Sequence, residues 1–129
     1  MAKRGAVRPT DAELAILRVL WRLGPSTVRQ VQQALEASQP TGYTTALKLL
    51  QIMAVKGLVD RDESQRSHVY RARSGEDETQ KQLVSDLMER AFGGSAQRLV
   101  MQALASKRST PEELDAIRRL IDELEGGRA

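Results

Sequence analysis

The alternation of hydrophobic and polar residues at the start of the chain predicts two helices joined by a tight break. Over residues 11–23, apolar side chains recur at the spacing of a helix and form a wide apolar stripe. Thr10 and Glu13 have the spacing of a capping box, which marks the start of this helix. A Gly-Pro pair ends it, and apolar residues at i, i+3 and i+7 then predict a second, short helix over 28–35.

The next stretch predicts a third helix and then a change of period. The third helix runs from near Tyr43 to Lys56, where Gly57 caps it. Residues 58–61 and 68–73 have the pattern of two β-strands, and the polar residues between them form a tight turn. Three helices followed at once by a hairpin make the winged variant of the helix-turn-helix, in which the hairpin covers an open face of the helical core.

The second half of the chain is predicted to be helical again. Ser74 and Asp77 have capping-box spacing at the start of a fourth helix, which should end at the Phe-Gly-Gly segment 92–94. A short fifth helix is expected around 99–104. Thr110 caps a sixth helix, whose first residue is proline and whose apolar residues follow a heptad-like spacing.

These last three helices carry apolar stripes but are too short to enclose a good core of their own. We therefore expect a second copy of the chain to supply the missing half. The candidate dimerisation residues are apolar positions of these stripes, namely Leu83, Leu87, Leu99, Leu104, Leu114, Ile117, Ile121 and Leu124.

The distribution of charge supports a division of the chain into functional parts. Residues 1–73 hold 12 Lys and Arg against 6 Asp and Glu, a net charge of +6, whereas residues 74–129 hold 8 against 11, a net charge of −3. A basic half suits a polyanion and an acidic half avoids it, although chance and solvated faces are an alternative reading. We therefore predict a flexible basic arm (1–9), a winged-helix DNA-binding domain (10–73) and a helical dimerisation domain (74–129), in a mainly α fold.

Composition excludes several classes of function. The chain has no cysteine, so disulfides, thiolate metal sites and a cysteine nucleophile are excluded. His68 is the only histidine, and the sequence offers no nucleophile-base pair, metal cluster or phosphate loop. We therefore expect no enzyme activity, no metal and no cofactor. The apolar runs fall short of the ~18–20 residues that cross a bilayer, so we expect no membrane partner and a cytoplasmic location.

The outward face of the third helix carries residue types that read DNA. Thr44, Lys48 and Gln51 fall at i, i+4 and i+7 and share one side of the helix. Ala46 and Leu50 lie on the opposite side. Threonine, lysine and glutamine side chains can contact base edges and phosphates in the major groove. An ordinary solvated helix face is the alternative interpretation.

Two further positions are candidates for contact with the DNA backbone. Thr27 stands at the start of the second helix, where free amides can bind phosphate, although a purely structural cap fits equally well. Arg66 lies at the tip of the predicted hairpin, where a guanidinium can meet the backbone or the minor groove. The alternative for Arg66 is a solubilising charge in a turn.

Three segments together resemble the penicillinase-repressor family of bacterial transcription regulators, the BlaI/MecI/CopY type. They are the stretch 43–59 (YTTALKLLQIMAVKGLV), the start 10–14 (TDAEL) leading to Leu20-Trp21, and the segment 91–95 (AFGGS) followed by Leu99-Val100. The resemblance implies a winged-helix DNA-binding domain, a C-terminal helical dimerisation domain, and repression by dimers at palindromic operators. It also implies that Tyr43 and Thr45, which match the family's helix-start motif, contact phosphates.

Two departures from the family pattern concern the inducing signal. The copper-responsive branch carries paired cysteines near its C-terminus, and this chain has none, so sensing through metal thiolates is excluded. In the β-lactam branch a sensor protease cuts at an Asn-Phe pair in the fifth helix, whereas the matching place here, 100–103, reads Val-Met-Gln-Ala. The resemblance thus implies a sensor protease as a partner, but Gln102-Ala103 replaces its cleavage pair.

These features predict a sequence-specific repressor that acts as a homodimer on double-stranded DNA with an inverted-repeat operator. Two recognition helices related by a twofold axis would meet half-sites about 34 Å apart, one turn of the duplex. A protein-interaction adaptor built on a winged-helix module is the alternative, since a fold alone does not fix function. The basic first half discriminates between the two, because an adaptor does not require it.

Overall fold

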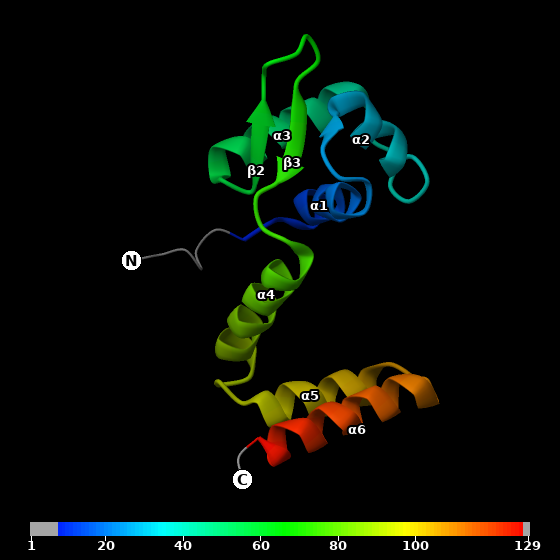
Figure 1. The fold of residues 1–129 in the computed structure, drawn as a ribbon, viewed down its shortest axis with the longest axis vertical. Coiled ribbons are helices and arrows are strands. Elements are labelled where there is room, and N and C mark those ends of the chain that lie inside the picture. Colours follow the sequence, from blue (N-terminus) through cyan, green and yellow to red (C-terminus); the bar gives the residue numbers. More distant parts are fainter. Residues whose placement is uncertain (1–7, 128–129) are drawn as a thin grey trace. The chain divides into compact units, whose positions relative to one another are not determined.

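Six helices and a small β-sheet make up residues 8–127, the part of the chain that the computed structural model describes (Figure 1). In chain order the elements are α1 (Asp11–Leu23), β1 (Ser26–Thr27), α2 (Val28–Leu35), α3 (Tyr43–Lys56), β2 (Val59–Asp62), β3 (Val69–Ala72), α4 (Glu76–Ala91), α5 (Ala96–Ser106) and α6 (Pro111–Gly126). The predicted mainly α class, with three helices followed by a hairpin, is confirmed. The expected basic arm lies outside the described residues, apart from its last two positions.

Local sequence signals account for where several helices begin and end. The Thr10 side-chain oxygen accepts a hydrogen bond from Glu13 N at 3.2 Å, and Thr10 N donates to the Glu13 carboxylate at 3.0 Å. This capping box starts α1 at the predicted residue, and the same reciprocal arrangement between Thr110 and Glu113 starts α6. Gly57 ends α3 in the left-handed conformation, with a φ of 87° that favours glycine.

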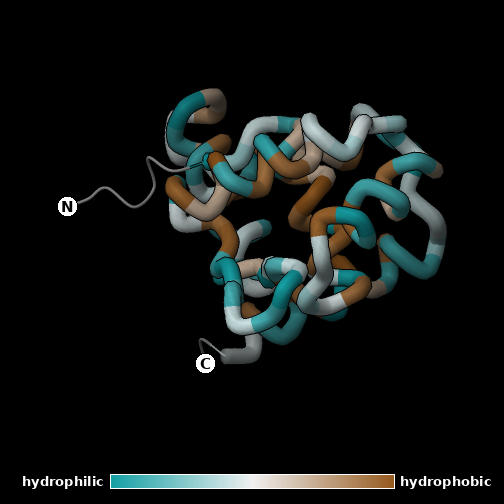
Figure 2. Tube along the Cα trace, turned by 90° about the horizontal axis from the view of Figure 1, so that it is seen from above, coloured by the Kyte–Doolittle hydropathy of each residue, from teal (hydrophilic) through white to brown (hydrophobic). Residues whose placement is uncertain are grey.

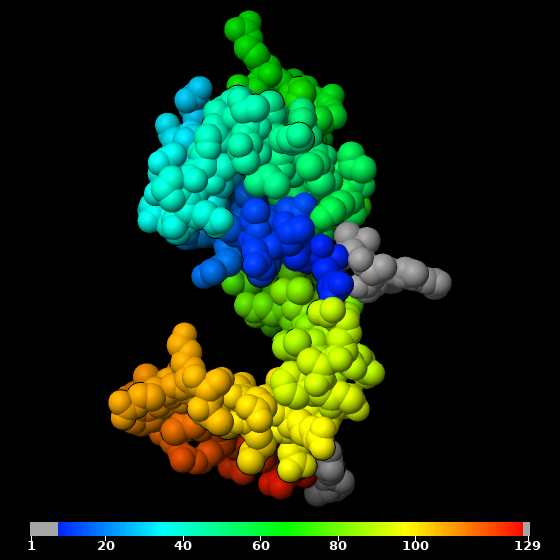
Figure 3. Space-filling model, turned by 180° about the vertical axis from the view of Figure 1, so that it is seen from behind, coloured from blue at the N-terminus to red at the C-terminus, as the bar shows by residue number. Residues whose placement is uncertain are grey.

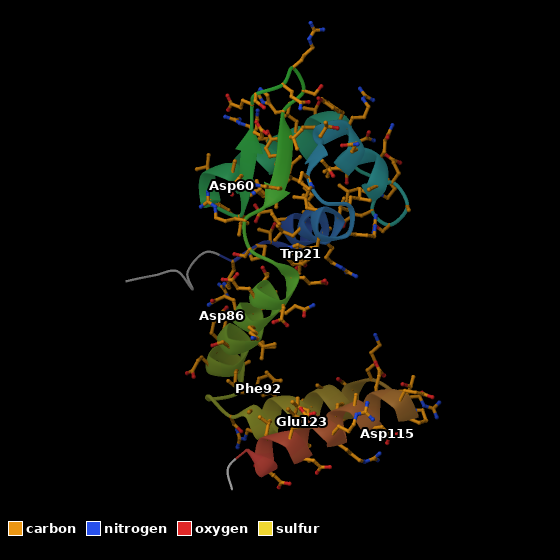
Figure 4. The ribbon with its side chains drawn as sticks, viewed as in Figure 1. Trp21, Asp60, Asp86, Phe92, Asp115 and Glu123 are labelled. Carbon is orange, nitrogen blue, oxygen red and sulfur yellow. The ribbon has the colours of Figure 1, made fainter. Side chains whose placement is uncertain are left out.

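The core of the winged-helix part lies between α1, α2, α3 and the sheet. Hydrophobic and hydrophilic positions alternate along the helices, as the coloured trace in Figure 2 shows, so each helix has an apolar side. The buried residues that form this core are Ile16, Leu17, Val19, Leu20, Val28, Val31, Leu35, Ala46, Leu50, Met53, Val59 and Tyr70. Half-buried Trp21 packs against them, and its indole Nε1 donates a hydrogen bond to the carbonyl of Ser74 at 3.0 Å (Figure 4).

The sheet has three antiparallel strands in the order β1-β3-β2, and the β2–β3 hairpin forms the wing. In the register of the hairpin, Arg61 lies opposite Tyr70 and Val59 opposite Ala72. The prediction of only two strands was incomplete, because Ser26 of β1 pairs with Tyr70 and joins the hairpin to the helical part. β2 lies one residue later than predicted, and β3 is shorter by one residue at each end.

Contacts within the chain divide it into two compact units, one that ends at Asp86 and one that begins at Leu87. Helix α4 contributes to both units. In the first unit, Arg8 NH1 donates to an oxygen of Asp86 at 2.7 Å, which ties α4 to the segment before α1 (Figure 4). The functional division between residues 73 and 74 stays a prediction.

The start of α4 differs from the sequence-based prediction. The helix begins at Glu76, and the carbonyl of Gly75 accepts the hydrogen bond from Thr79 N. A capping box of Ser74 and Asp77 would have started the helix one residue earlier, so that prediction was wrong. The reason is tertiary, since the Ser74 carbonyl is engaged by Trp21 at the point where the chain leaves the sheet.

Helices α4, α5 and α6 contain no buried residue in the part of the chain that the structure describes. Ser95 caps α5 by accepting a hydrogen bond from Arg98 N at 3.1 Å, so the helix start is locally specified. The helices are thus well formed, yet the chain alone does not cover their apolar sides.

Candidate nucleic-acid interface

Helix α3 presents two chemically different faces. Its inner face is completely buried and consists of Ala46, Leu50 and Met53, each 0% exposed. Its outer face carries Thr44, Lys48 and Gln51, all exposed, as the spacing predicts. With a rise of about 1.5 Å per residue, these three side chains extend along about 10 Å of helix, close to the ~12 Å width of the major groove. Their contact with bases stays a prediction.

The outer side of α3 also carries two apolar residues that sequence reasoning did not single out. Val55 is 90% exposed and Ile52 is 39% exposed. Val55 follows Thr44 by three helical turns and therefore lies on the same side. The helical periodicity already contained this signal, because neither residue belongs to the buried side. Aliphatic groups at such a place are suited to contact the methyl groups of thymine.

The beginning of α3 brings an arginine and a tyrosine together. Tyr43, the first residue of α3, is 44% exposed, and Thr45 is exposed beside it. The guanidinium carbon of Arg29, in the first turn of α2, lies 5.3 Å from the centre of the Tyr43 ring, a cation–π contact. Sequence reasoning missed Arg29, since the contact depends on how α2 and α3 pack.

Thr27 is the N-cap of α2. Its side-chain oxygen accepts a hydrogen bond from Gln30 N at 3.2 Å, and Thr27 N donates to Gln30 Oε1 at 2.8 Å. This reciprocal box has a local signal in the sequence, a threonine followed three residues later by glutamine, which was missed in the prediction. Thr27 therefore has a structural role, and its contact with phosphate stays a prediction.

The arginines of the wing differ in whether an ion pair engages them. Arg73 donates to Asp60 through Nε at 3.0 Å and NH2 at 2.7 Å, and Arg61 pairs with Glu63. No ion pair within residues 8–127 engages Arg66, which lies in the turn at the wing tip. The wing projects from the body of its unit in the space-filling view (Figure 3). Arg66 thus keeps its charge available to an external anion.

Hydrogen bonds also fix the charge state of the wing's carboxylates. The bond from the Arg73 guanidinium holds the pKa of Asp60 below its ordinary value (Figure 4). The Ser64 amide donates to the Asp62 carboxylate at 2.9 Å, which lowers the pKa of Asp62. Both carboxylates are therefore ionised at neutral pH, and they offset the cations on the strands.

A cleft of about 360 Å³ lies between the start of α2, the start of α3 and the wing. Thr27, Tyr43 and Arg66, all predicted to contact the DNA backbone, line this cleft together. Arg29 lines it as well, whereas Lys48 and the other predicted base-reading residues of α3 do not. The predicted residues thus form two groups, a cleft that gathers candidate backbone contacts and a helix face that presents candidate base contacts.

An ion pair fastens the C-terminal end of α3. Lys56 Nζ lies 2.8 Å and 2.9 Å from the two carboxylate oxygens of Glu13, whose side chain is 3% exposed. The same carboxylate accepts the capping hydrogen bond from Thr10 N. One buried acid therefore starts α1 and also holds the end of α3, so the outer face of α3 has a fixed orientation.

The predicted dimerisation residues form no buried core within the described chain. Half of them are exposed, namely Leu87, Leu104, Ile121 and Leu124. The other half are partly buried, namely Leu83, Leu99, Leu114 and Ile117. Further exposed apolar side chains on the same helices are Val84, Val100, Met101 and Leu120. Exposed apolar surface of this kind marks an interaction site.

The described residues contain no group of three or more side chains able to hold a metal ion. His68 lies in the same cleft as Arg66 and Tyr43. No helix in this part of the chain is long and apolar enough to cross a membrane.

Comparisons with known proteins agree with this arrangement. The model of the penicillinase repressor family matches residues 9–123. Two curated relatives are the transcriptional regulator BlaI from two strains of Mycobacterium tuberculosis, each 39% identical over 119 residues, which are 91% of this chain and 85% of the relative. Among solved structures, the hsRosR-S4 complex structure has a TM-score of 0.54 at 16% identity and covers 97% of this chain and 96% of that chain, a likeness of fold alone.

Proposed function

The chain belongs to the penicillinase repressor family, and we propose on this premise that it represses transcription as a homodimer bound to an inverted-repeat operator. Membership in this family makes it a DNA-binding transcriptional repressor, and its relatives are regulators rather than enzymes. We propose the dimer, the symmetry of the operator and the contacting residues from the side chains of α3, the wing and the last three helices.

The two-faced helix α3 is the observation that carries the DNA-binding part of the proposal. Its inner face is fully buried, so the outer face cannot turn inward without disrupting the core. In our proposal Thr44, Lys48 and Gln51 contact base edges in the major groove. Tyr43 and Thr45, with Thr27 and Arg66, contact the flanking phosphates. Arg66 is suited to this role because no carboxylate of the described chain pairs with it.

The uncovered apolar side chains of α4, α5 and α6 support the homodimer. Exposures of 60% for Leu124 and 49% for Ile121 are high for leucine and isoleucine in a folded domain. A second copy offers the same apolar stripes, so a twofold interface would cover both sets at once. A twofold dimer presents two identical α3 helices, and an inverted repeat is the DNA symmetry that matches them.

Proteolytic relief of repression would act on helix α5. The segment 100–103, which matches the family's cleavage position, lies inside α5 and is exposed. A protease needs an extended substrate, so cleavage there would require α5 to unfold locally. Immunoblotting of the chain during induction tests this step, and an intact chain throughout induction would rule it out.

A gel-shift titration tests the repressor proposal directly. The probe is a palindromic site from the protein's own promoter region, and the control is a scrambled duplex of the same length and composition. We expect the palindrome to bind at least about 1,000-fold more tightly than scrambled DNA at physiological salt. Equal affinity for the two duplexes would reject sequence-specific repression and favour the adaptor alternative.

Charged substitutions in α6 test the dimer. Ile121→Asp and Leu124→Asp place a charge in the apolar stripe, whereas Arg119→Asp places the same side chain on the opposite side of the helix as a matched control. Light scattering should report monomers for the first two variants and dimers for the wild type and the control. Operator affinity should fall with dimerisation, because a monomer lacks the second half-site contact. Dimeric I121D and L124D proteins would contradict the proposed interface.

A further inference from the structure

The cleft between α2, α3 and the wing combines positive charge with an absence of acidic lining. Arg29 and Arg66 line it, and none of its lining residues is an aspartate or glutamate. Two other clefts of the winged helix differ in this respect, because one is lined by Glu78 and the other by Asp60 and Asp62. A concave site with two guanidinium groups and no carboxylate attracts anions, since its low-dielectric walls focus the field.

Arg29 is held in place by an aromatic ring. Its guanidinium carbon lies 5.3 Å from the centroid of the Tyr43 ring, and no ion pair within residues 8–127 engages it. An aromatic contact of this kind restricts a long side chain that otherwise samples many rotamers. The planar guanidinium carries five N–H donors, and contact with a ring face leaves in-plane donors available. Arg29 is thus preorganised to bind a tetrahedral oxyanion.

Ring and hydroxyl groups in the cleft complement the two arginines. Tyr43 and Thr27 each bring a hydroxyl to the lining, and Ser67 and His68 of the wing complete the polar side. The Thr27 oxygen already accepts the cap bond from Gln30 N, so its hydroxyl hydrogen remains available for donation. The chemistry is that of a site for a phosphate group, with donors supplied from three separate elements.

We propose that this cleft binds one phosphate of the DNA backbone in each protomer, with Arg29 as a direct contact and the Tyr43 ring as its positioning residue. The inference rests on the proposed function and extends it to a residue outside α3 and the wing. A phosphate seated between α2 and the wing would set the depth at which the outer face of α3 enters the groove. The contact reads no sequence, so its effect extends to nonspecific DNA.

The salt dependence of DNA binding tests the proposal without knowledge of the operator. The probe is a fluorescein-labelled duplex of about 30 base pairs with arbitrary sequence, titrated with the full-length protein at salt concentrations from about 50 to 300 mM. Arg29→Ala should make the negative slope of log K against log salt less steep, by about 0.9 for each bound protomer. Arg18→Ala, which removes an exposed arginine from α1, should leave the slope unchanged.

The outcomes separate this inference from the proposed function. A wild-type protein that binds neither this duplex nor the operator would overturn the proposed function itself. A wild type that binds, with Arg29→Ala and Arg18→Ala giving equal slopes, would overturn only the phosphate site. Circular dichroism of each variant checks the fold, and Arg29→Lys gives a second measurement, since it keeps the charge but loses the planar fork.

Two substitutions of Tyr43 test the positioning role. Tyr43→Phe keeps the ring and removes the hydroxyl, whereas Tyr43→Leu removes the ring. We expect the loss of affinity on Arg29→Ala to be undiminished in the Phe background and clearly reduced in the Leu background, because in our proposal the ring positions Arg29. An equal Arg29→Ala effect in both backgrounds would overturn the positioning role.

A neutral methylphosphonate in the operator tests the direct contact between Arg29 and a phosphate. At the contacted phosphate, this substitution should cancel the effect of Arg29→Ala on affinity. An Arg29→Ala effect that is undiminished at every substituted phosphate would reject the direct contact.

Discussion

Replacement of Glu13 by alanine removes one buried carboxylate that serves two helices at once. Its oxygens accept two hydrogen bonds from Lys56 Nζ, at 2.8 and 2.9 Å, and one from Thr10 N at 3.0 Å. The cap bond from the Thr10 amide contributes about 1 kcal/mol, and the hydrogen bonds from the ammonium about 1.5–3 kcal/mol. The desolvation cost of the acid offsets part of this gain, and Lys56 is one-third exposed and returns easily to water. We therefore expect Glu13→Ala to lower the free energy of unfolding by about 2–3 kcal/mol.

Two further substitutions separate the roles of Glu13. Glu13→Gln keeps an oxygen for the Thr10 amide and loses the charge, so it should cost about 1–2 kcal/mol. Lys56→Met keeps the aliphatic stem but leaves a carboxylate buried without its partner, which should cost about 2–4 kcal/mol. The double variant should cost about 1 kcal/mol less than the sum of the two single variants, because the lost interaction is the same one.

Urea unfolding followed by the fluorescence of Trp21, the chain's single tryptophan, measures these differences. All variants must be compared at one protein concentration, since dimerisation makes apparent stability depend on concentration. The reasoning fails if Glu13→Ala unfolds within about 0.5 kcal/mol of the wild type, the range of an ordinary surface substitution. Additive effects of Glu13→Gln and Lys56→Met would equally show that the pair contributes nothing as a pair.

Two further predictions concern the core and the wing. Leu50→Ala should destabilise the fold by about 3–5 kcal/mol because Leu50 is 0% exposed. Val55→Ala, on the outer face of the same helix, should change the free energy of unfolding by less than about 0.5 kcal/mol. Equal effects of the two substitutions in urea unfolding would contradict the assignment of the two faces. Asp60 should titrate below its ordinary pKa in an NMR pH series because Arg73 donates to its carboxylate, and Arg73→Gln should raise that pKa. Because the pKa of Asp60 is lower in the folded state, the pair contributes its full share to the free energy of unfolding above the unfolded-state pKa. This share is lost as the pH falls through the folded-state pKa. A free energy of unfolding that rises on acidification through this range would refute the stabilising role of the pair.

The sequence predicts best the features that depend on neighbouring residues. The start of α1 follows from the capping box of Thr10 and Glu13, and the two faces of α3 follow from helical periodicity, so both are found as expected. The capping box at Thr27 and Gln30 is equally local and was available to the same reasoning. Signals of this kind need only a few consecutive residues, and they do not depend on the rest of the fold.

Features that depend on contacts between distant residues were not predicted from the sequence, and the reason is common to all of them. Strand β1 has two residues and no strand pattern of its own, and it exists because Ser26 pairs with Tyr70 of the neighbouring strand β3. Glu13 contacts Lys56 across 43 positions, and the Arg29–Tyr43 contact requires α2 and α3 to pack first. Their detection needs the topology as well as the pattern. The candidate base contacts were therefore predicted as a group, and the cleft beside them was not.

The division between a DNA-reading face and uncovered apolar helices has a consequence for regulation. In our proposal each protomer offers few base contacts, and a single half-site with few contacts binds weakly. Pairing two protomers makes the second contact intramolecular, with an effective concentration that reaches about millimolar for a short connection. Occupancy of the operator then depends on the pairing equilibrium as strongly as on α3 itself. Any event that separates the protomers, whether cleavage, a ligand or dilution, would therefore relieve repression.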